Sequence, residues 1–175
     1  DGTYLHYACG ITSLYYRRGT PNSDGTITWS AVEQTVSTMY NSVRFPFVST
    51  DSSGYVWIGY IDHDGTNDYP FVIKSGNNNG TWGTTPLGFP HCMTTISDPT
   101  WKVSIIPLTS NRTLAVYSRN NDFVRAKRWN GSEWNTPVAT TEKMNFGYQH
   151  SAVAQSDDVH ITFLNITYDL FYCKY

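Results

Sequence analysis

Charged residues are scarce in this sequence: Lys, Arg, Asp and Glu make up 15% of its 175 residues, and the formal net charge is −2. The few cationic residues form no basic run, which argues against nucleic acid or an anionic membrane surface as a partner. No apolar stretch approaches the roughly 20 residues that a membrane-spanning helix needs. No segment repeats its apolar residues at helical spacing either. The sequence therefore predicts a chain without helices and without membrane insertion.

Cysteine is also rare, and its three residues show no CxxC spacing, so neither a metal knuckle nor a redox motif is expected. Cys9, Cys92 and Cys173 fit either one disulfide with a free thiol or three thiols packed as small apolar groups; we favour the thiols. The five histidines show no His-x-x-x-His spacing, which argues against a set of metal ligands. His6 and His160 occupy matching strand positions, which predicts a shared packing role.

Aromatic residues, by contrast, make up another 15% of the chain. Because Tyr, Ser, Thr and Asn supply most of the surface chemistry, we expect an extracellular or cell-surface location. Four Asn-x-Ser/Thr sequons fall in predicted turns, where a glycan could project into water. A chain rich in Asn, Ser and Thr also produces sequons by chance, so glycosylation and chance both stay open. The candidate asparagines are Asn79, Asn111, Asn130 and Asn165.

Three turns rich in Gly and Asn each end in a tryptophan, and these tryptophans are almost evenly spaced. Trp29 and Trp82 are 53 residues apart, and Trp82 and Trp134 are 52 apart. A repeat of this length that consists of strands and turns is typical of a β-propeller, in which each repeat forms one small antiparallel sheet.

The segments between these turns read as strands, because short runs of β-branched and aromatic residues are bounded by Gly, Asn, Asp and Ser. Four pairs of runs predict hairpins: Tyr4–Tyr7 with Leu14–Arg17, Val56–Tyr60 with Tyr69–Lys74, Leu114–Tyr117 with Phe123–Lys127, and Val159–Phe163 with Leu170–Lys174. Three further runs predict the innermost strands of later repeats: Phe45–Val48, Trp101–Ile106 and Ser151–Ala154. The prediction is an all-β partial propeller over residues 1–175, with four-stranded repeats at approximately 1–44, 45–98, 99–149 and 150–175.

These repeats amount to roughly three and a half blades, whereas closed propellers usually have four to eight. Both ends of the chain fall inside a blade and would leave sheet edges open. We therefore expect further chain or another copy to complete the propeller, and two copies would give about seven blades. We favour further chain, because Asp1 is not an initiator Met. We also expect that these 175 residues alone do not form a stable monomer.

The Trp turns resemble the Asp box of sialidase-like propellers, in which Ser-x-Asp-x-Gly-x-Thr-Trp is the usual order. Ser23-Asp24-Gly25 with Thr28-Trp29, and Ser75 with Gly80-Thr81-Trp82, follow that order in part, and Asn130–Trp134 follows it less closely. The stretch from Val116 to Trp134 is also similar to repeats of bacterial propeller lectins. This resemblance implies structural tryptophans at Trp29, Trp82 and Trp134, in turns whose polar side chains bond their own backbone.

Sialidase chemistry would need an arginine cluster, a Tyr with a Glu partner and an Asp acid/base. Arg44 precedes the predicted strand Phe45–Val48, where such an arginine would lie, but Arg44-Phe45-Pro46 departs from the Arg-Ile-Pro of that family. The glutamates fall in or just after Trp turns, on the outer side of a blade, so no pair of facing carboxylates can be assembled. We assign no catalytic residue and favour Arg44 as a solvated residue at the strand entrance. The glutamates are Glu33, Glu133 and Glu142.

One acidic segment could bind a hard cation. Asp62, Asp64 and Asp68 flank a glycine, in a spacing that calcium would accept. Asp-Gly is itself a favoured hairpin turn, and we favour this interpretation. We therefore expect no cofactor, with calcium as the weaker alternative.

These observations together favour an extracellular or cell-surface propeller module with a non-catalytic role in carbohydrate recognition or adhesion. Glycans or cell-surface proteins would be its partners, because aromatic faces and polar side chains in loops suit sugars. Two alternatives remain open. The chain is a segment of a sialidase-like glycoside hydrolase whose catalytic residues lie elsewhere, or it is a purely structural component of a surface or filament.

Overall fold

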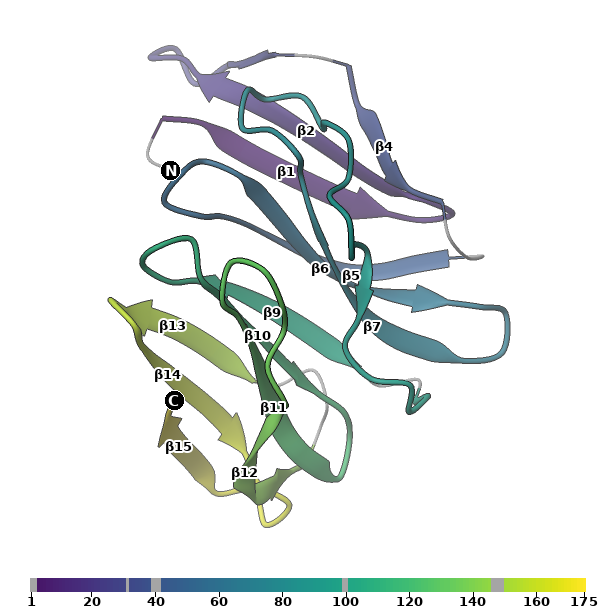
Figure 1. Ribbon diagram of the computed structural model, residues 1–175, viewed down its shortest axis with the longest axis vertical. Helices are drawn as coiled ribbons and strands as arrows, with labels where there is room; N and C mark the ends of the chain where they lie inside the picture. The colour runs from purple at the N-terminus through teal and green to yellow at the C-terminus, as the bar shows by residue number, and fades with distance from the viewer. Residues whose placement is uncertain (1–2, 31, 39–41, 99–100, 146–149) are drawn as a thin grey trace.

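The computed structural model describes residues 3–30, 32–38, 42–98, 101–145 and 150–175. Within these ranges there is no helix, and so none long and apolar enough to cross a membrane. The described residues form fifteen strands (Figure 1). They are β1 (Leu5–Gly10), β2 (Leu14–Pro21), β3 (Ile27–Trp29), β4 (Gln34–Ser37), β5 (Ser42–Thr50), β6 (Val56–His63), β7 (Asp68–Lys74), β8 (His91–Cys92), β9 (Lys102–Pro107), β10 (Thr113–Ser118), β11 (Asp122–Trp129), β12 (Val138–Met144), β13 (Ser151–Gln155), β14 (Asp158–Leu164) and β15 (Leu170–Lys174).

The strands form four antiparallel sheets that succeed one another in chain order. Sheet A contains β1–β4, with both β3 and β4 paired to β2; sheet B contains β5–β8, sheet C contains β9–β12, and sheet D contains β13–β15. Sheet A lies at one extreme of the molecule and sheet D at the other (Figure 1). This succession is consistent with a propeller-like fold, and the sheets do not close into a ring. The all-β prediction is confirmed, as are the four hairpins.

The first strands of sheets B, C and D are the three runs that the sequence predicts as innermost strands. The fourth repeat forms a sheet of its own with three strands. Several strand bounds differ from the predicted runs by a few residues, and the difference at β5 affects the position of Arg44. Strand β5 begins at Ser42, so Arg44 lies inside the strand and not before it.

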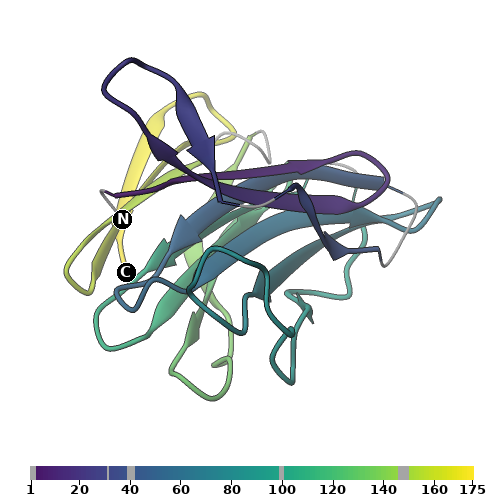
Figure 2. The ribbon, with the colours of Figure 1, turned by 90° about the horizontal axis from the view of Figure 1, so that it is seen from above.

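Three apolar clusters fill the spaces between consecutive sheets. Sheet A packs on sheet B through residues such as Tyr16 and Ile58, as the stacked sheets in Figure 2 show. Trp57 and Val103 belong to the cluster between sheets B and C, and Phe163 to the cluster between C and D. Strands β6 and β10 are therefore buried on both faces, whereas β13 and β15 alternate between exposed and half-buried residues.

The Trp turns are held by Asx and hydroxyl contacts. Asp24 Oδ1 accepts hydrogen bonds from the N–H and the hydroxyl of Thr26, at 2.9 and 2.6 Å. Asn79 does the same for Thr81, and Asn130 for Ser132. Such bonds satisfy backbone groups that no strand pairs, which explains why these polar residues form the turns.

The matching histidines make matching contacts. His6 Nδ1 lies 3.0 Å from the Tyr16 hydroxyl, and His160 Nδ1 lies 2.7 Å from that of Tyr172. Each ring also stacks on its tyrosine, with ring centroids 6.1 and 5.9 Å apart. Sheets A and D thus repeat one local structure, in which the two histidines have the same packing role.

Candidate functional site

An interruption of strand β5 exposes two aromatic side chains. The pairing of β5 with β6 shifts register between Arg44 and Phe47, where Pro46 offers no N–H to the ladder. Phe45 has a φ of 51°, which L-residues rarely adopt, and its side chain is 59% exposed. Phe47 is 39% exposed. A shallow cavity of about 230 Å³ is lined by these residues together with Lys102 and Val103.

A second, polar cavity lies beside Arg44, at the end of the β6–β7 hairpin. Its volume is about 140 Å³, and its lining consists of Arg44, His63, Thr66, Asn67, Asp68, Ser97 and Asp98. Asp68 organises this site: its Oδ2 accepts from Arg44 Nη1 at 3.2 Å, and its Oδ1 lies 2.7 Å from His63 Nδ1. Asp64 closes the hairpin turn by accepting from the N–H groups of Thr66 and Asn67. The cavity therefore combines an arginine and a histidine with carboxylate acceptors.

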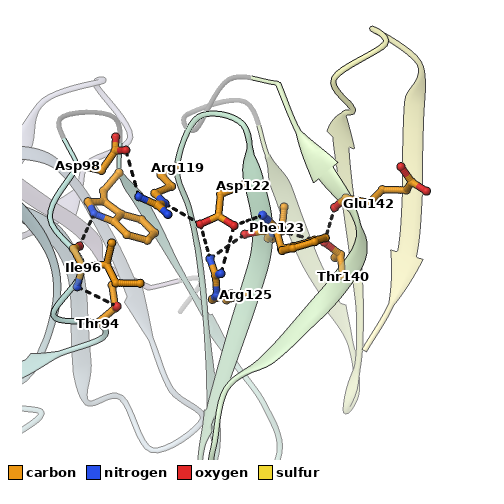
Figure 3. A network of polar contacts seen from close by, with 11 residues as sticks. Thr94, Ile96, Asp98, Arg119, Asp122, Phe123, Arg125, Thr140 and Glu142 are labelled. Atoms are coloured by element: carbon orange, nitrogen blue, oxygen red, sulfur yellow. Dashed lines mark hydrogen bonds and ion pairs between the residues drawn. The ribbon is translucent and has the colours of Figure 1, made fainter.

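Asp98 connects this cavity to a network of ion pairs on sheet C. Its N–H donates to the Asp68 carbonyl at 3.3 Å, and its Oδ2 lies 3.4 Å from Arg119 Nη1. Arg119 and Arg125 both donate to Asp122, at 2.6 and 2.9 Å (Figure 3). Burial alone would raise the pKa of Asp122. The hydrogen bonds from Arg125, Arg119 and the Phe123 N–H outweigh it and hold that pKa at about 2.

A buried polar cluster supports the same end of sheet C. Lys102 donates to the His150 carbonyl at 2.8 Å. The two ring nitrogens of His150 lie 2.6 Å from the Ser118 hydroxyl and 3.0 Å from that of Ser104. Burial, with the charge of Lys102, lowers the pKa of His150 to about 3, so the imidazole is neutral at physiological pH. This cluster positions Lys102 beside the exposed phenylalanines.

The three aspartates proposed for calcium have three different surroundings. Asp62 is fully buried on β6, Asp64 caps the turn, and Asp68 pairs with Arg44 and His63. Within the described part of the chain, no three His, Cys, Asp or Glu side chains are grouped to hold a metal ion. Asp62, Asp64 and Asp68 therefore do not form one such group in that part of the chain.

Arg44 is half exposed, with 44% of its side chain accessible, and is paired to Asp68. The glutamates lie away from both cavities: Glu142 is on the outer strand β12, Glu133 is exposed in a Trp turn, and Glu33 is near Cys9. Asn79, Asn111 and Asn130 are exposed, and Asn165 is half buried. Cys9, Cys92 and Cys173 are free and half buried.

The tryptophans of the turns pack on neighbouring sheets. The Trp82 ring lies 5.5 Å from that of Tyr16 in sheet A. The Trp134 ring lies 6.3 Å from that of Trp57 in sheet B. Trp29 lies on the other face of sheet A, 6.5 Å from Tyr7.

Sequence reasoning missed Phe45, Phe47, Asp98 and Arg119 as site residues. Pro46 within an apolar run is a signal for the first two, because proline inside a sheet marks an edge or a bulge. No sequence signal points to the contact between Asp98 and Arg119, which depends on how sheets B and C pack.

No protein-family model and no curated protein matches the sequence. Among solved structures, the chain is similar to one described as Hadza microbial sialidase Hz136, at 14% identity and a TM-score of 0.49. The similarity covers 98% of this chain and 37% of that chain. This chain therefore spans little more than a third of that protein, and similarity at this level is no evidence of activity.

Proposed function

We propose that this chain is a non-catalytic carbohydrate-binding module, and that its site comprises the β5 bulge and the adjoining polar cavity. The observation that carries the proposal is the exposure of Phe45 and Phe47, which line the shallow cavity and follow Arg44 of the polar cavity in strand β5. Exposed aromatic faces accept the C–H faces of a sugar ring, and fixed polar groups bind its hydroxyls.

The charges of the cavity favour a neutral sugar. Asp98 would accept hydrogen bonds from sugar hydroxyls, and the carboxylates of Asp68 and Asp98 would repel an added carboxylate. The Arg44 guanidinium is already engaged by Asp68, which leaves it less suited to an acidic sugar. The volume of about 140 Å³ is small for a ligand site and suits a single sugar unit.

Hydrolysis is less well supported than binding. Glycoside hydrolysis generally needs one carboxylic acid with a raised pKa and a second carboxylate facing it. Asp68 is held by Arg44 and His63, and no glutamate lines the cavity. Asp62 has a raised pKa but is fully buried on β6. The hydrolase alternative therefore requires residues from outside this chain.

A glycan array probed with the full chain tests this function. We expect binding to a subset of neutral glycans, and a loss of at least tenfold in affinity for both Phe45→Ala and Arg44→Ala. Arg128→Ala on sheet C is the matched control, because Arg128 is exposed and lies outside both cavities. An array without binding, or binding that both variants retain, would contradict the proposal.

A fluorogenic glycoside distinguishes the hydrolase alternative. Turnover by the wild-type chain that is lost in Arg44→Ala would establish catalysis at this site in place of simple binding.

The exposed sequon asparagines also support an extracellular or cell-surface location as part of the proposal. The intact mass of the protein secreted by a glycosylating host shows whether these asparagines carry glycans. A mass equal to that of the unmodified chain would remove the support that the sequons give to an extracellular location.

A further inference from the structure

Lys102 is a half-buried lysine at the start of β9, the first strand of sheet C. Its Nζ donates to the carbonyl of His150 at 2.8 Å, and no carboxylate of the described residues forms an ion pair with it. The amines of Lys74 and Lys174, by contrast, lie 3.7 and 2.7 Å from aspartate oxygens. The Lys102 ammonium is therefore partly removed from water without a countercharge among these residues.

The surroundings of this amine are apolar. The shallow cavity of about 230 Å³ that Lys102 lines has Phe45, Pro46, Phe47 and Val103 as its other lining residues. It lies where the bulge of β5 meets β9, so its walls come from the first strands of sheets B and C. Of the five lining residues, Lys102 alone has a polar side chain.

Burial changes the protonation of this amine. It lowers the pKa of Lys102 below the ordinary value, because water solvates an ammonium ion better than these surroundings do. At neutral pH a larger fraction of Lys102 than of an exposed lysine is thus the neutral amine, which has a lone pair. The bond to the His150 carbonyl uses one N–H and restricts the side chain. A desolvated lysine in an apolar pocket is a good nucleophile toward carbonyl compounds.

We propose that a small aldehyde with a flat apolar body binds covalently at Lys102 as an imine. Its body would pack on Phe45 and Phe47, with its carbonyl carbon toward Nζ. The Nζ lone pair attacks that carbon, and the carbonyl oxygen leaves as water with both hydrogens of the amine, so that a C=N bond replaces the C=O bond. This condensation is reversible and needs neither an oxidant nor a reductant. The cavity is smaller than the roughly 300–1,000 Å³ of drug-sized ligand sites, which limits the ligand to a small aldehyde.

The imine site does not depend on carbohydrate binding, although both proposals use the β5 bulge. Sugar hydroxyls would bind in the polar cavity beside Arg44, whereas the imine forms at the amine of β9. A chain that binds no glycan can therefore still form the imine. A chain that binds glycans but whose Lys102 is unreactive would support the first proposal alone.

Reductive labelling of the full chain with benzaldehyde and cyanoborohydride at pH 7 tests the inference, because the reductant converts an imine into a stable secondary amine. Peptide mapping by mass spectrometry gives the rate at each lysine. Lys127 is the matched internal control: it is also half-buried and its pKa is also lowered by burial, but it lines neither cavity of the candidate site. We expect Lys102 to be labelled at least tenfold faster than Lys127 in the folded chain, and at nearly the same rate in concentrated urea. Equal or slower labelling of Lys102 in the folded chain would overturn the proposal.

A double variant tests whether the apolar walls hold the aldehyde. We expect Phe45→Ala/Phe47→Ala to lower the labelling rate at Lys102 at least threefold and to leave the rate at Lys127 unchanged. Leu87→Ala is the control, since Leu87 is exposed and apolar and lines neither cavity; it should leave both rates unchanged. An undiminished rate at Lys102 in the double variant would contradict the proposal. The comparison of the two lysines in the wild type holds even if the double variant fails to fold.

Discussion

Asp62 is a carboxyl group whose burial works against the folded state at neutral pH. Desolvation, with a smaller contribution from the charge of Asp64, raises the pKa of Asp62 to about 6. The folded state therefore holds this proton more tightly than the unfolded state does. Its stabilising contribution is complete below pH about 4 and is lost as the pH rises through 6.

We therefore expect Asp62→Asn to stabilise the protein above pH 6, by about 2 kcal/mol at pH 7.5, because it removes a buried charge. At pH 4 the variant and the wild type should unfold at nearly the same urea concentration. Urea unfolding at the two pH values measures both effects. A variant that is destabilised equally at both would show that the Asp62 carboxylate has a role other than the one argued here.

Asp122 behaves in the opposite way, because four hydrogen bonds, two of them from Arg125, stabilise its charged form. Its pKa of about 2 lies below the ordinary value, so its contribution is present above pH about 4 and is lost as the pH falls through 2. We expect Asp122→Asn to lower the free energy of unfolding by about 2 kcal/mol at pH 7. The difference should shrink toward pH 2. Asp158→Asn, at an exposed ion pair, is the control and should have little effect.

Strand β5 shows a conflict between stability and the proposed function. Phe45 has a left-handed φ of 51°, which costs a non-glycine residue about 1 kcal/mol or more, and it buries little surface in return. Glycine adopts this conformation without strain. We expect Phe45→Gly to raise the free energy of unfolding by about 0.5–1 kcal/mol and to abolish glycan binding.

Phe47→Ala is the matched comparison, because Phe47 is exposed without a left-handed φ. It should weaken binding without any gain in stability. Thermal unfolding and the glycan assay together measure both quantities. If Phe45→Gly destabilised the chain, the φ of Phe45 would not be a source of strain.

The strands of this fold could be predicted because each has a local signal. The runs Val56–Tyr60 and Leu114–Tyr117 are apolar at every position, as expected of strands buried on both faces, and they form the middle of sheets B and C. The turns could be predicted because Asn, Asp and Thr side chains complete them within a few residues.

The candidate site could not be predicted to the same extent, because its contacts join distant segments. Arg44 and Asp68 belong to different strands of sheet B, and Asp98 reaches Arg119 of sheet C. The pattern of apolar and polar residues in the sequence determines neither the direction of a side chain at a bulge nor the packing of one sheet on the next. For Phe45, the one local signal is Pro46, which marks a bulge or an edge in the run but does not tell which side chains become exposed.

At the scale of the whole molecule, the sheets differ in how many of their faces are covered. Sheets B and C have neighbours on both sides, and their strands β6 and β10 are buried on both faces. Sheets A and D have one neighbour each. In an array of this kind, stability is approximately the sum of the contributions of each repeat and of its contacts with its neighbours. Under dilute conditions, the two outer sheets should therefore open more readily than the inner two.

Native-state hydrogen exchange on the dilute chain tests this gradient. We expect the highest protection in β6 and β10, and at least tenfold lower protection factors in β1 and β15. Phe163→Ala removes a buried ring between sheets C and D and should cost about 3–5 kcal/mol locally. Because its contacts are confined to that boundary, it should accelerate exchange in β13–β15 while β6 changes little. Equal acceleration in all four sheets would show that the chain unfolds as one cooperative unit and that the outer sheets have no separate stability.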